Sequence, residues 1–210
     1  MQLIAHRGLT NDYIKENTIE AFLNALNNGY DGIELDIRLT KDKKIVVLHD
    51  KLINRTSNGK GNINNFTYKE LLKYNFGTKE IKSKIPLLSI VIEKISNKVI
   101  IIELKEKIDL KDLENILIKN PTNNYYISSF NKEHIDNIKD TKYKKGLINY
   151  IFNSNVNIKD YDFVLILESL FNKDIYNYLK ENNIEPIIYG TLNKINLKNK
   201  DIMNNIKYIV

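Results

Sequence analysis

The sequence of 210 residues contains no cysteine, which excludes disulfide bonds and thiolate metal sites and leaves the redox compartment undefined. It also lacks any run of the roughly 18 consecutive apolar residues that a membrane-spanning helix needs. We expect no signal peptide, because the first strand-like segment, 3–6, begins almost at the first methionine. These absences lead us to expect a cytoplasmic protein without a transmembrane segment.

Tryptophan is absent too, whereas asparagine, isoleucine and lysine are abundant. The formal net charge of +6 raises the question of nucleic-acid binding. The positive residues are nearly all lysines, however, and they are interleaved with Asp and Glu along the chain. They form no stripe with stacking aromatic residues. We therefore attribute the charge to compositional drift and expect no nucleic-acid partner.

The length suits one sizeable core, so we predict a single domain over residues 1–210. Most intervals between the strand-like segments carry helical periodicity, and this alternation indicates a parallel sheet, either open and doubly wound or closed. We predict the closed form, a TIM (β/α)8 barrel, in which one of the nine strand candidates is surplus or peripheral. The candidates are short β-branched runs at 3–6, 32–36, 45–49, 99–104, 125–129, 146–150, 163–167, 186–189 and 207–210.

Helical periodicity is clearest from about Asn17 to Asn28, with Gly29 as the stop. The residues predicted on its buried face are Ile19, Phe22, Leu23 and Leu26. A second helix is predicted over 109–119, capped by Asp109. Weaker helical segments lie near 131–139, 172–182 and 199–205.

The interval between Asp36 and His49 is too short for a crossover helix, so we expect a local β-excursion before the third strand. The long interval that follows, about 51–97, is predicted to be a small insertion on the barrel rim. It contains a Thr67/Glu70 capping box and an apolar helix after Pro86.

Two carboxylates, Glu34 and Asp36, lie within an otherwise apolar strand. Alternate residues of a strand share a face, so the two side chains point the same way, about 7 Å apart. Like charges on an apolar face repel each other and resist desolvation. A bound cation usually compensates such a pair of negative charges.

Further polar residues follow other predicted strands, where active sites of barrels and open α/β sheets lie. We expect these groups to converge in one pocket. They are His6 and Arg7 after the first strand, His49 and Asp50 after the third, and Glu103 and Lys105 on the fourth.

Several of these residues have structural interpretations beside the functional ones. Asn17, with Glu20 three residues later, caps the first helix or contacts substrate. Lys105 binds phosphate or pairs with Glu103. Glu16 and Asp50 are more typical of structural partners, and His134 of a solvated helix residue. Ser128 has no partnering base, and Phe130 fits packing or a pocket wall.

The residues between 4 and about 130 also carry an ordered set of motifs, dense up to residue 56. In their order and spacing they resemble the glycerophosphodiester phosphodiesterase family. The motifs are Ala5-His6-Arg7-Gly8, Glu16-Asn17-Thr18, Glu34-Leu35-Asp36, Leu39-Thr40-Lys41-Asp42, Val46-Val47-Leu48-His49-Asp50, Arg55-Thr56, Glu103-Leu104-Lys105 and Ser128-Ser129-Phe130.

The resemblance implies a TIM barrel that hydrolyses glycerophosphodiesters to glycerol 3-phosphate and an alcohol with a divalent cation. It implies that Glu34, Asp36 and Glu103 are the metal ligands. His6 and His49 would then be the acid/base pair. The residues expected to contact phosphate or substrate are Arg7, Lys105 and, as one of its two interpretations, Asn17.

The residue chemistry agrees with those roles. Three carboxylates without thiols suit a hard cation, Ca²⁺ or Mg²⁺. Histidine titrates near neutral pH and can transfer protons, and arginine offers paired donors to phosphate.

The later part of the chain departs from the family pattern. Gly190 stands where the family has an aromatic residue, and strand alternation predicts that Tyr189 points to the other face. The sequence stops at Val210, without the Thr-Asp pair and helix that follow the last strand in the family, so we expect a shortened C-terminus and looser closure. Two alternatives stay open: a phospholipid or lysophospholipid phosphodiesterase of phospholipase D type, with the segment 87–95 as an apolar rim, and a metal- or phosphate-binding barrel with impaired catalysis. The sequence does not define the oligomeric state.

Overall fold

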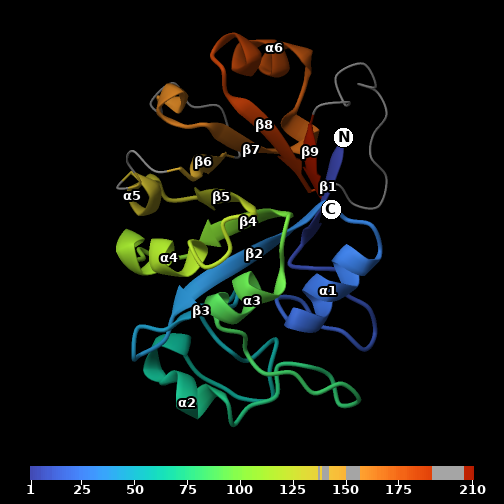
Figure 1. Cartoon of the computed structure of the whole chain (residues 1–210), viewed down its shortest axis with the longest axis vertical. Helices are drawn as coiled ribbons and strands as arrows, with labels where there is room; N and C mark the ends of the chain where they lie inside the picture. The colour runs from blue at the N-terminus through green and yellow to red at the C-terminus, as the bar shows by residue number, and fades with distance from the viewer. Residues whose placement is uncertain (137, 139–141, 150–156, 191–205) are drawn as a thin grey trace.

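The computed structural model describes residues 1–136, 138, 142–149, 157–190 and 206–210. Within them, nine strands form one sheet in the order β1-β9-β8-β7-β6-β5-β4-β2-β3, and β1 also pairs with β2 (Figure 1). The sheet therefore closes on itself, which confirms the TIM barrel and excludes the open alternative. The parallel barrel strands are β1 (Gln2–His6), β2 (Gly32–Leu39), β4 (Val99–Leu104), β5 (Asn124–Ser129), β6 (Lys144–Asn149), β7 (Phe163–Leu167), β8 (Glu185–Tyr189) and β9 (Lys207–Ile209).

The last strand, β9, joins the two ends of the sheet. It pairs in parallel with both β8 and β1, and its ladder extends through the Val210 carbonyl, which accepts from the His6 amide at 2.8 Å. The β1–β9 junction is thus hydrogen-bonded, and the looser closure that we expected is not what the described strands show.

The surplus strand is the third, β3 (Ile45–Val47), and our placement of the excursion before it was wrong. This strand runs antiparallel to β2, with Ile37 opposite Val47 and Leu39 opposite Ile45. The turn between the two strands is closed by Thr40, whose hydroxyl accepts from the Lys44 amide at 2.9 Å. The third candidate is therefore itself the excursion, a hairpin outside the barrel, and the third barrel strand is β4.

The predicted helices flank the barrel strands in shortened form. Apart from the segment between β3 and β4, the described helices between barrel strands are α1 (Ile19–Asn27), α4 (Leu110–Leu117), α5 (Lys132–Ile135) and α6 (Lys173–Glu181), with 3₁₀ turns η2 (Ile158–Asp160) and η3 (Glu168–Leu170). Asp109 caps α4 as predicted, and the predicted segment 199–205 lies outside the described residues.

The buried face of α1 differs from the predicted one, because it includes two alanines and does not include Leu23. Ala21, Phe22 and Ala25 are buried against the barrel, whereas Leu23 is 38% exposed. The helix begins one residue later than predicted, because Thr18 is the cap and its hydroxyl accepts from the Ala21 amide at 3.2 Å. The helix packs mainly through small residues that bring it close to β2.

The segment between β3 and β4 contains η1 (Ile63–Asn65), α2 (Tyr68–Leu71) and α3 (Leu88–Lys94), and it extends beyond β3 in Figure 1. The predicted Thr67/Glu70 capping box is present at α2. The apolar residues of α3 (Leu88, Val91 and Ile92) are buried in the same cluster as the outer face of β2 and β4. This helix therefore does not provide the exposed apolar rim considered for a lipid substrate.

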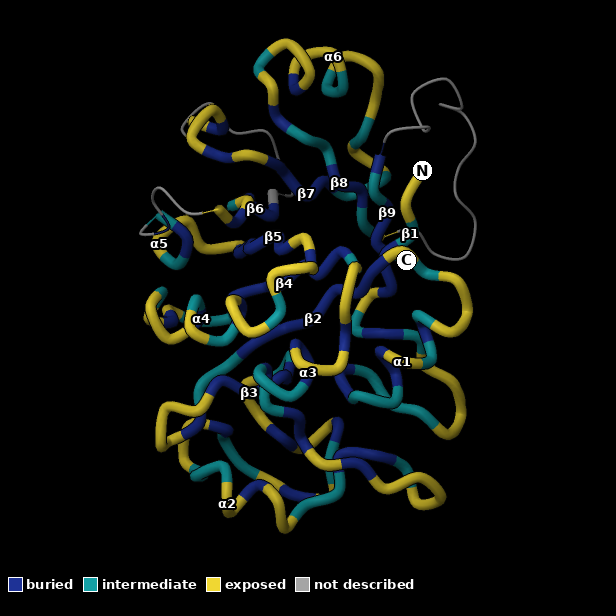
Figure 2. The backbone as a smooth tube through the Cα atoms, in the orientation of Figure 1, coloured by how far each residue is buried: buried dark blue, intermediate teal, exposed yellow. Residues whose placement is uncertain are grey.

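The barrel interior is filled by side chains from every second strand position. In Figure 2 the barrel strands are largely buried, whereas the helices and loops around them are more exposed. Gly146 on β6 makes room for the Phe163 ring, because a Cβ there would lie 2.3 Å from that ring. In the described residues, no helix is both long and apolar enough to cross a membrane. The interior cluster comprises Ile4, Val99, Ile101, Tyr126, Ile148, Phe163, Leu165, Ile187 and Ile209.

Candidate active site

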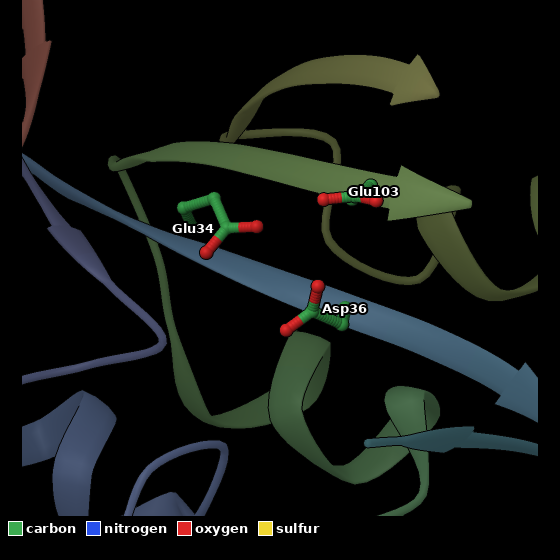
Figure 3. A group of neighbouring side chains, drawn as sticks. All are labelled: Glu34, Asp36 and Glu103. Atoms are coloured by element: carbon green, nitrogen blue, oxygen red, sulfur yellow. The ribbon is translucent and has the colours of Figure 1, made fainter. Parts of the chain in front are cut away.

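The three predicted metal ligands meet at the carboxyl-terminal edge of the barrel. Glu34 and Asp36 alternate on β2 as predicted, and Glu103 on β4 stands opposite Asp36 in the parallel register. Figure 3 shows the three carboxylates turned toward one another, and one oxygen from each lies within 4.8 Å of the others. All three side chains are buried.

This concentration of charge changes the proton affinity of the trio. Burial, followed by the charges of Asp36 and Glu103, raises the pKa of Glu34 well above its usual range. Burial and the charge of Asp36 also raise the pKa of Glu103. Three buried carboxylate oxygens this close together form a donor set that suits a hard divalent cation. The residues present therefore fit the metal that the resemblance implied.

Two cationic side chains lie beside the trio. The Lys105 ammonium lies 3.0 Å from Asp36 Oδ1 and also hydrogen-bonds Glu103, so the predicted Lys105–Glu103 pair exists and includes Asp36. The Arg7 guanidinium Nε lies 3.3 Å from Asp36 Oδ2, and its backbone amide donates to Glu34 at 3.1 Å. Both cations thus face the carboxylates and the cavity above them.

The loop after β1 is held in a tight shape by left-handed backbone at Arg7, Gly8 and Asn17, with φ of 57°, 82° and 56°. A Cβ at Gly8 would lie 2.7 Å from Ala21, so glycine lets this loop contact α1. The Asn17 side chain is buried and donates to Asp36 Oδ2 at 2.8 Å. Its helix-capping interpretation was therefore wrong, because Thr18 caps α1 and Asn17 orients a carboxylate of the trio.

The two predicted catalytic histidines lie at the same edge. His6 ends β1 opposite Glu34, with its Nε2 3.9 Å from Glu34 Oε2 and its side chain half exposed. Desolvation of its ring and the charge of Arg7 lower the pKa of His6. His49 arrives by a different route from the one predicted, because the hairpin rather than a barrel strand carries it there.

Hydrogen bonds extend the hairpin past β3. The Leu48 amide donates to the Asp36 carbonyl at 2.9 Å, which leaves His49 beside the barrel mouth. The His49 carbonyl accepts from Arg38 Nε at 2.8 Å, and its Nδ1 lies 2.6 Å from Asp50 Oδ1. These contacts anchor both the backbone and the ring of His49.

A network of charges that the sequence did not reveal adjoins the two histidines. Arg55 hydrogen-bonds the carboxylates of both Glu16 and Asp50, and Glu16 also accepts from Arg7 Nη1 at 3.0 Å. Although burial opposes it, the hydrogen bonds from Arg55 and the charge of Arg7 lower the pKa of Glu16 to about 2. The hydrogen bonds from Arg55 lower the pKa of Asp50 as well, against desolvation. The Arg55-Thr56 motif was the sequence signal, but nothing in it indicated the partners.

A cavity of about 190 Å³ lies over the trio. Six of the eight predicted site residues line it, while Asp36 and Asn17 lie next to its floor. The opposite wall is apolar and includes Phe130, which confirms its interpretation as a pocket wall, and Tyr189, whose predicted orientation away from the site was wrong. The lining residues are His6, Arg7, Glu34, His49, Glu103, Lys105, Phe130, Ile148, Leu165, Tyr189 and Ile209.

The remaining histidine and the serine lie apart from this cavity. His134 is not a freely solvated residue, because its Nδ1 lies 3.1 Å from Ser129 Oγ and 3.4 Å from the Leu104 carbonyl. Ser128 is fully buried, and its hydroxyl points to the Ile102 carbonyl at 3.5 Å. Neither residue is placed to act on a ligand in the cavity.

The chain is similar in sequence to members of one enzyme family. The glycerophosphoryl diester phosphodiesterase family matches residues 6–183. A glycerophosphodiester phosphodiesterase of Caldanaerobacter subterraneus is 42% identical over 149 residues, which cover 65% of this chain and 61% of that protein. Human lysophospholipase D is 34% identical over 143 residues, 63% of this chain and 42% of that protein. The alignments thus span about half the length of these relatives.

Solved structures share the fold over nearly the whole chain. The glycerophosphodiester phosphodiesterase of Thermotoga maritima is 28% identical, with a TM-score of 0.80 over 99% of this chain and 92% of that one. An Oleispira antarctica phosphodiesterase, solved in complex with the product sn-glycerol-3-phosphate, is 24% identical, with a TM-score of 0.83 over 100% of this chain and 92% of that one. The likeness covers β1 to β9.

Proposed function

The chain belongs to the glycerophosphoryl diester phosphodiesterase family, and from this premise we propose that it hydrolyses a glycerophosphodiester to glycerol 3-phosphate and an alcohol. One observation carries the proposal: three buried carboxylates within 4.8 Å of one another adjoin two histidines, an arginine and a lysine around a single cavity. We propose that residues 1–210 act as one catalytic domain. A cytoplasmic location stays a prediction.

We assign the cation to Glu34, Asp36 and Glu103. Ca²⁺ and Mg²⁺ both accept carboxylate oxygens, and either would compensate the negative charge that raises the pKa of Glu34 and Glu103. When bound, such a cation supplies polarisation of the phosphodiester and neutralisation of the charge that develops on its oxygens.

We assign phosphate binding to Arg7 and Lys105. Both line the cavity and lie beside the trio, so their charges are directed at a phosphate resting there. The guanidinium of Arg7 has paired donors, and the Lys105 ammonium is a compact point charge. Together they hold the diester with phosphorus over the carboxylates.

The two histidines divide the proton transfers. His6 has a lowered pKa and is therefore neutral near pH 7, as a general base must be. It takes a proton from the attacking water as the new oxygen–phosphorus bond forms. His49 holds its Nδ1–H against Asp50, and its imidazolium form would donate the Nε2 proton to the ester oxygen whose bond to phosphorus breaks. The products are a phosphate monoester and an alcohol.

The test is a product assay on the purified protein. We expect release of glycerol 3-phosphate from glycerophosphodiesters in the presence of Ca²⁺, Mg²⁺ or Mn²⁺, and none with a chelator. No release from any glycerophosphodiester with each cation supplied would contradict the proposal. Ligand binding by calorimetry without turnover would instead identify a barrel with impaired catalysis.

A lysophospholipid is the second candidate substrate, and the apolar wall of the cavity favours it. Ile148, Leu165 and Ile209 face the charged half of the cavity and would contact an apolar part of the substrate. Human lysophospholipase D is also among the relatives, at 34% identity. Faster hydrolysis of micellar lysolipid than of the soluble head-group diester would support this candidate, and the reverse order would exclude it as the main substrate.

A further inference from the structure

Arg55 uses two edges of its guanidinium on two different carboxylates. Nη1 and Nη2 donate to the two oxygens of Glu16, each at 2.8 Å. Nε and Nη2 donate to the two oxygens of Asp50 at 2.7 and 3.0 Å. Four hydrogen bonds in one plane hold both carboxylates in fixed orientations. The two acids come from separate loops, after β1 and after β3.

Asp50, one of the two carboxylates held by Arg55, also contacts the ring of His49. Asp50 Oδ1 lies 2.6 Å from His49 Nδ1, so a carboxylate held by Arg55 fixes the proton on Nδ1 and the plane of the ring. The free nitrogen, Nε2, is then the one available to a ligand in the cavity that His49 lines. Rotation of the Asp50 carboxylate would release this constraint.

The Glu16 side leads to Arg7. Glu16 Oε1 accepts from Arg7 Nη1 at 3.0 Å and from Arg55 Nη2 at 2.8 Å. This contact holds the far end of the Arg7 guanidinium, whose Nε lies 3.3 Å from Asp36. One side chain therefore connects the groups that we assign to proton donation and to phosphate binding.

We propose that Arg55 is a positioning residue that aligns His49 through Asp50 and Arg7 through Glu16. This inference rests on the proposed function, because it assigns work to two of its residues. Arg55 itself does not line the cavity, and its side chain is 49% exposed. Exposed ion pairs add little to stability, so the alignment of the two loops is the larger effect expected from its bonds.

The first test compares Arg55→Met and Arg55→Lys with a matched control, Lys119→Met. Lys119, in the turn after α4, is similarly exposed at 47% and forms an ion pair with Glu93 on α3, away from the cavity. We expect Arg55→Met to lower kcat by about 10–100-fold, the usual cost of losing a residue that orients a ligand or catalytic group. Arg55→Lys keeps the charge, but an ammonium lacks the planar set of donors that binds two carboxylates at once. Its kcat should therefore fall nearly as far as that of Arg55→Met. Full activity in Arg55→Lys, or an equal loss in Lys119→Met, would overturn the proposal.

The second test is a double-mutant cycle with Asp50→Asn. If Arg55 acts on His49 through Asp50, Arg55→Met combined with Asp50→Asn should lose little more kcat than the more damaging single variant. Losses that multiply would show independent roles and would contradict the proposal. Glu16→Gln should mainly raise KM, because it releases the phosphate-binding Arg7.

The third test does not depend on activity. Nitrogen NMR of the neutral form of the histidine rings should show His49 with its single proton on Nδ1 in the wild type, and a mixture of tautomers in Arg55→Met and Arg55→Lys. An unchanged tautomer in both variants would refute the positioning role even if the enzyme is active. If the wild type hydrolyses no diester, the proposed function fails, and this measurement still decides whether Arg55 orients the ring. Circular dichroism shows whether each variant is folded. If Arg55→Met does not fold, the comparison uses Arg55→Lys alone.

Discussion

Asp36 on β2 stands directly opposite Glu103 on β4, and the Lys105 ammonium contacts both carboxylates. Asp36 also forms an ion pair with Arg7 and accepts a hydrogen bond from Asn17, so its negative charge has the most partners in the trio. Among the described residues, Glu34 accepts one hydrogen bond, from the Arg7 backbone amide, and its charge is the least compensated. The unfavourable charge of the metal-free site is therefore concentrated on Glu34.

Neutralising Glu34 should stabilise the metal-free protein. In the presence of a chelator, Glu34→Gln removes a buried charge whose pKa is raised by burial and by two carboxylates. We expect its free energy of unfolding in urea to exceed that of the wild type, because the folded state of the wild type holds this carboxylate at a raised pKa. Glu93→Gln, at an exposed position on α3, is the control and should change little. A less stable Glu34→Gln protein would contradict this account of the trio.

With cation added, the wild type should become more stable than Glu34→Gln. Saturating Ca²⁺ or Mg²⁺ stabilises whichever state binds it, by about 2.7 kcal/mol at one hundred times the Kd. The wild type should therefore show a rise in Tm with cation that Glu34→Gln lacks. Removal of the cation with chelator should return the wild type to its lower Tm. Equal shifts in the two proteins would place the cation elsewhere.

The stability of the metal-free protein should also depend on pH in a defined direction. The pKa of Glu34 is raised above its usual 4.5, so the folded state binds this proton more tightly than the unfolded state. The free energy of unfolding from this group is therefore highest at acid pH and falls as pH rises from about 4.5 through the folded pKa. The advantage of Glu34→Gln should widen over the same range and vanish at lower pH. Urea titrations with chelator at several pH values measure it.

The acid and base roles of the histidines can be separated by the leaving group. Replacing His6 by alanine should slow hydrolysis about 10²–10⁴-fold for every diester, because the attacking water loses its base. Replacing His49 by alanine should cost as much for an alkyl diester but far less for a 4-nitrophenyl diester, whose leaving group needs no proton. The opposite pattern would exchange the two roles. Steady-state rates on both substrates decide between them.

Asn17 and Thr18 are neighbours with separable roles. Asn17→Gly keeps the left-handed backbone but removes the hydrogen bond to buried Asp36, so it should lower stability by roughly 1–3 kcal/mol. It should also weaken cation binding about 10–100-fold. Thr18→Ala removes the cap of α1, which costs about 1 kcal/mol without affecting the cation. Cation titration followed by calorimetry compares the two, and equal affinities would show that Asn17 does not support the metal ligands.

The strand positions could be predicted from sequence because each strand is a short β-branched run between polar residues. Their pairing could not, since one antiparallel strand has the same composition as its parallel neighbours. The hairpin around β3 illustrates this: the spacing excluded a helix, but only the pairing of Ile37 with Val47 shows which strand leaves the barrel.

Within the site, the residues on β2 and β4 could be predicted because strand alternation fixes their direction. The same alternation places Tyr189 beside Ile187 on the interior face of β8, and its assignment to the other face was wrong because Gly190 was taken as the site position. The partners of Arg55 lie in loops, where no periodicity relates sequence separation to distance. Asn17 was ambiguous for the same reason, because the cap and the loop residue are adjacent in sequence and both are polar.

The cavity described above has walls from two consecutive parts of the chain. Its charged side chains come from β1 to Lys105, and its apolar ones from Phe130 to β9. Under the proposed function, bond cleavage and choice of alcohol are thus assigned to separate stretches of the sequence. A mutational library confined to positions such as Ile148, Leu165 and Tyr189 would sample new substrates without altering the groups that break the phosphodiester. Under the proposed function, changes in the second half of the chain alone would be enough to alter which alcohol the cavity accepts.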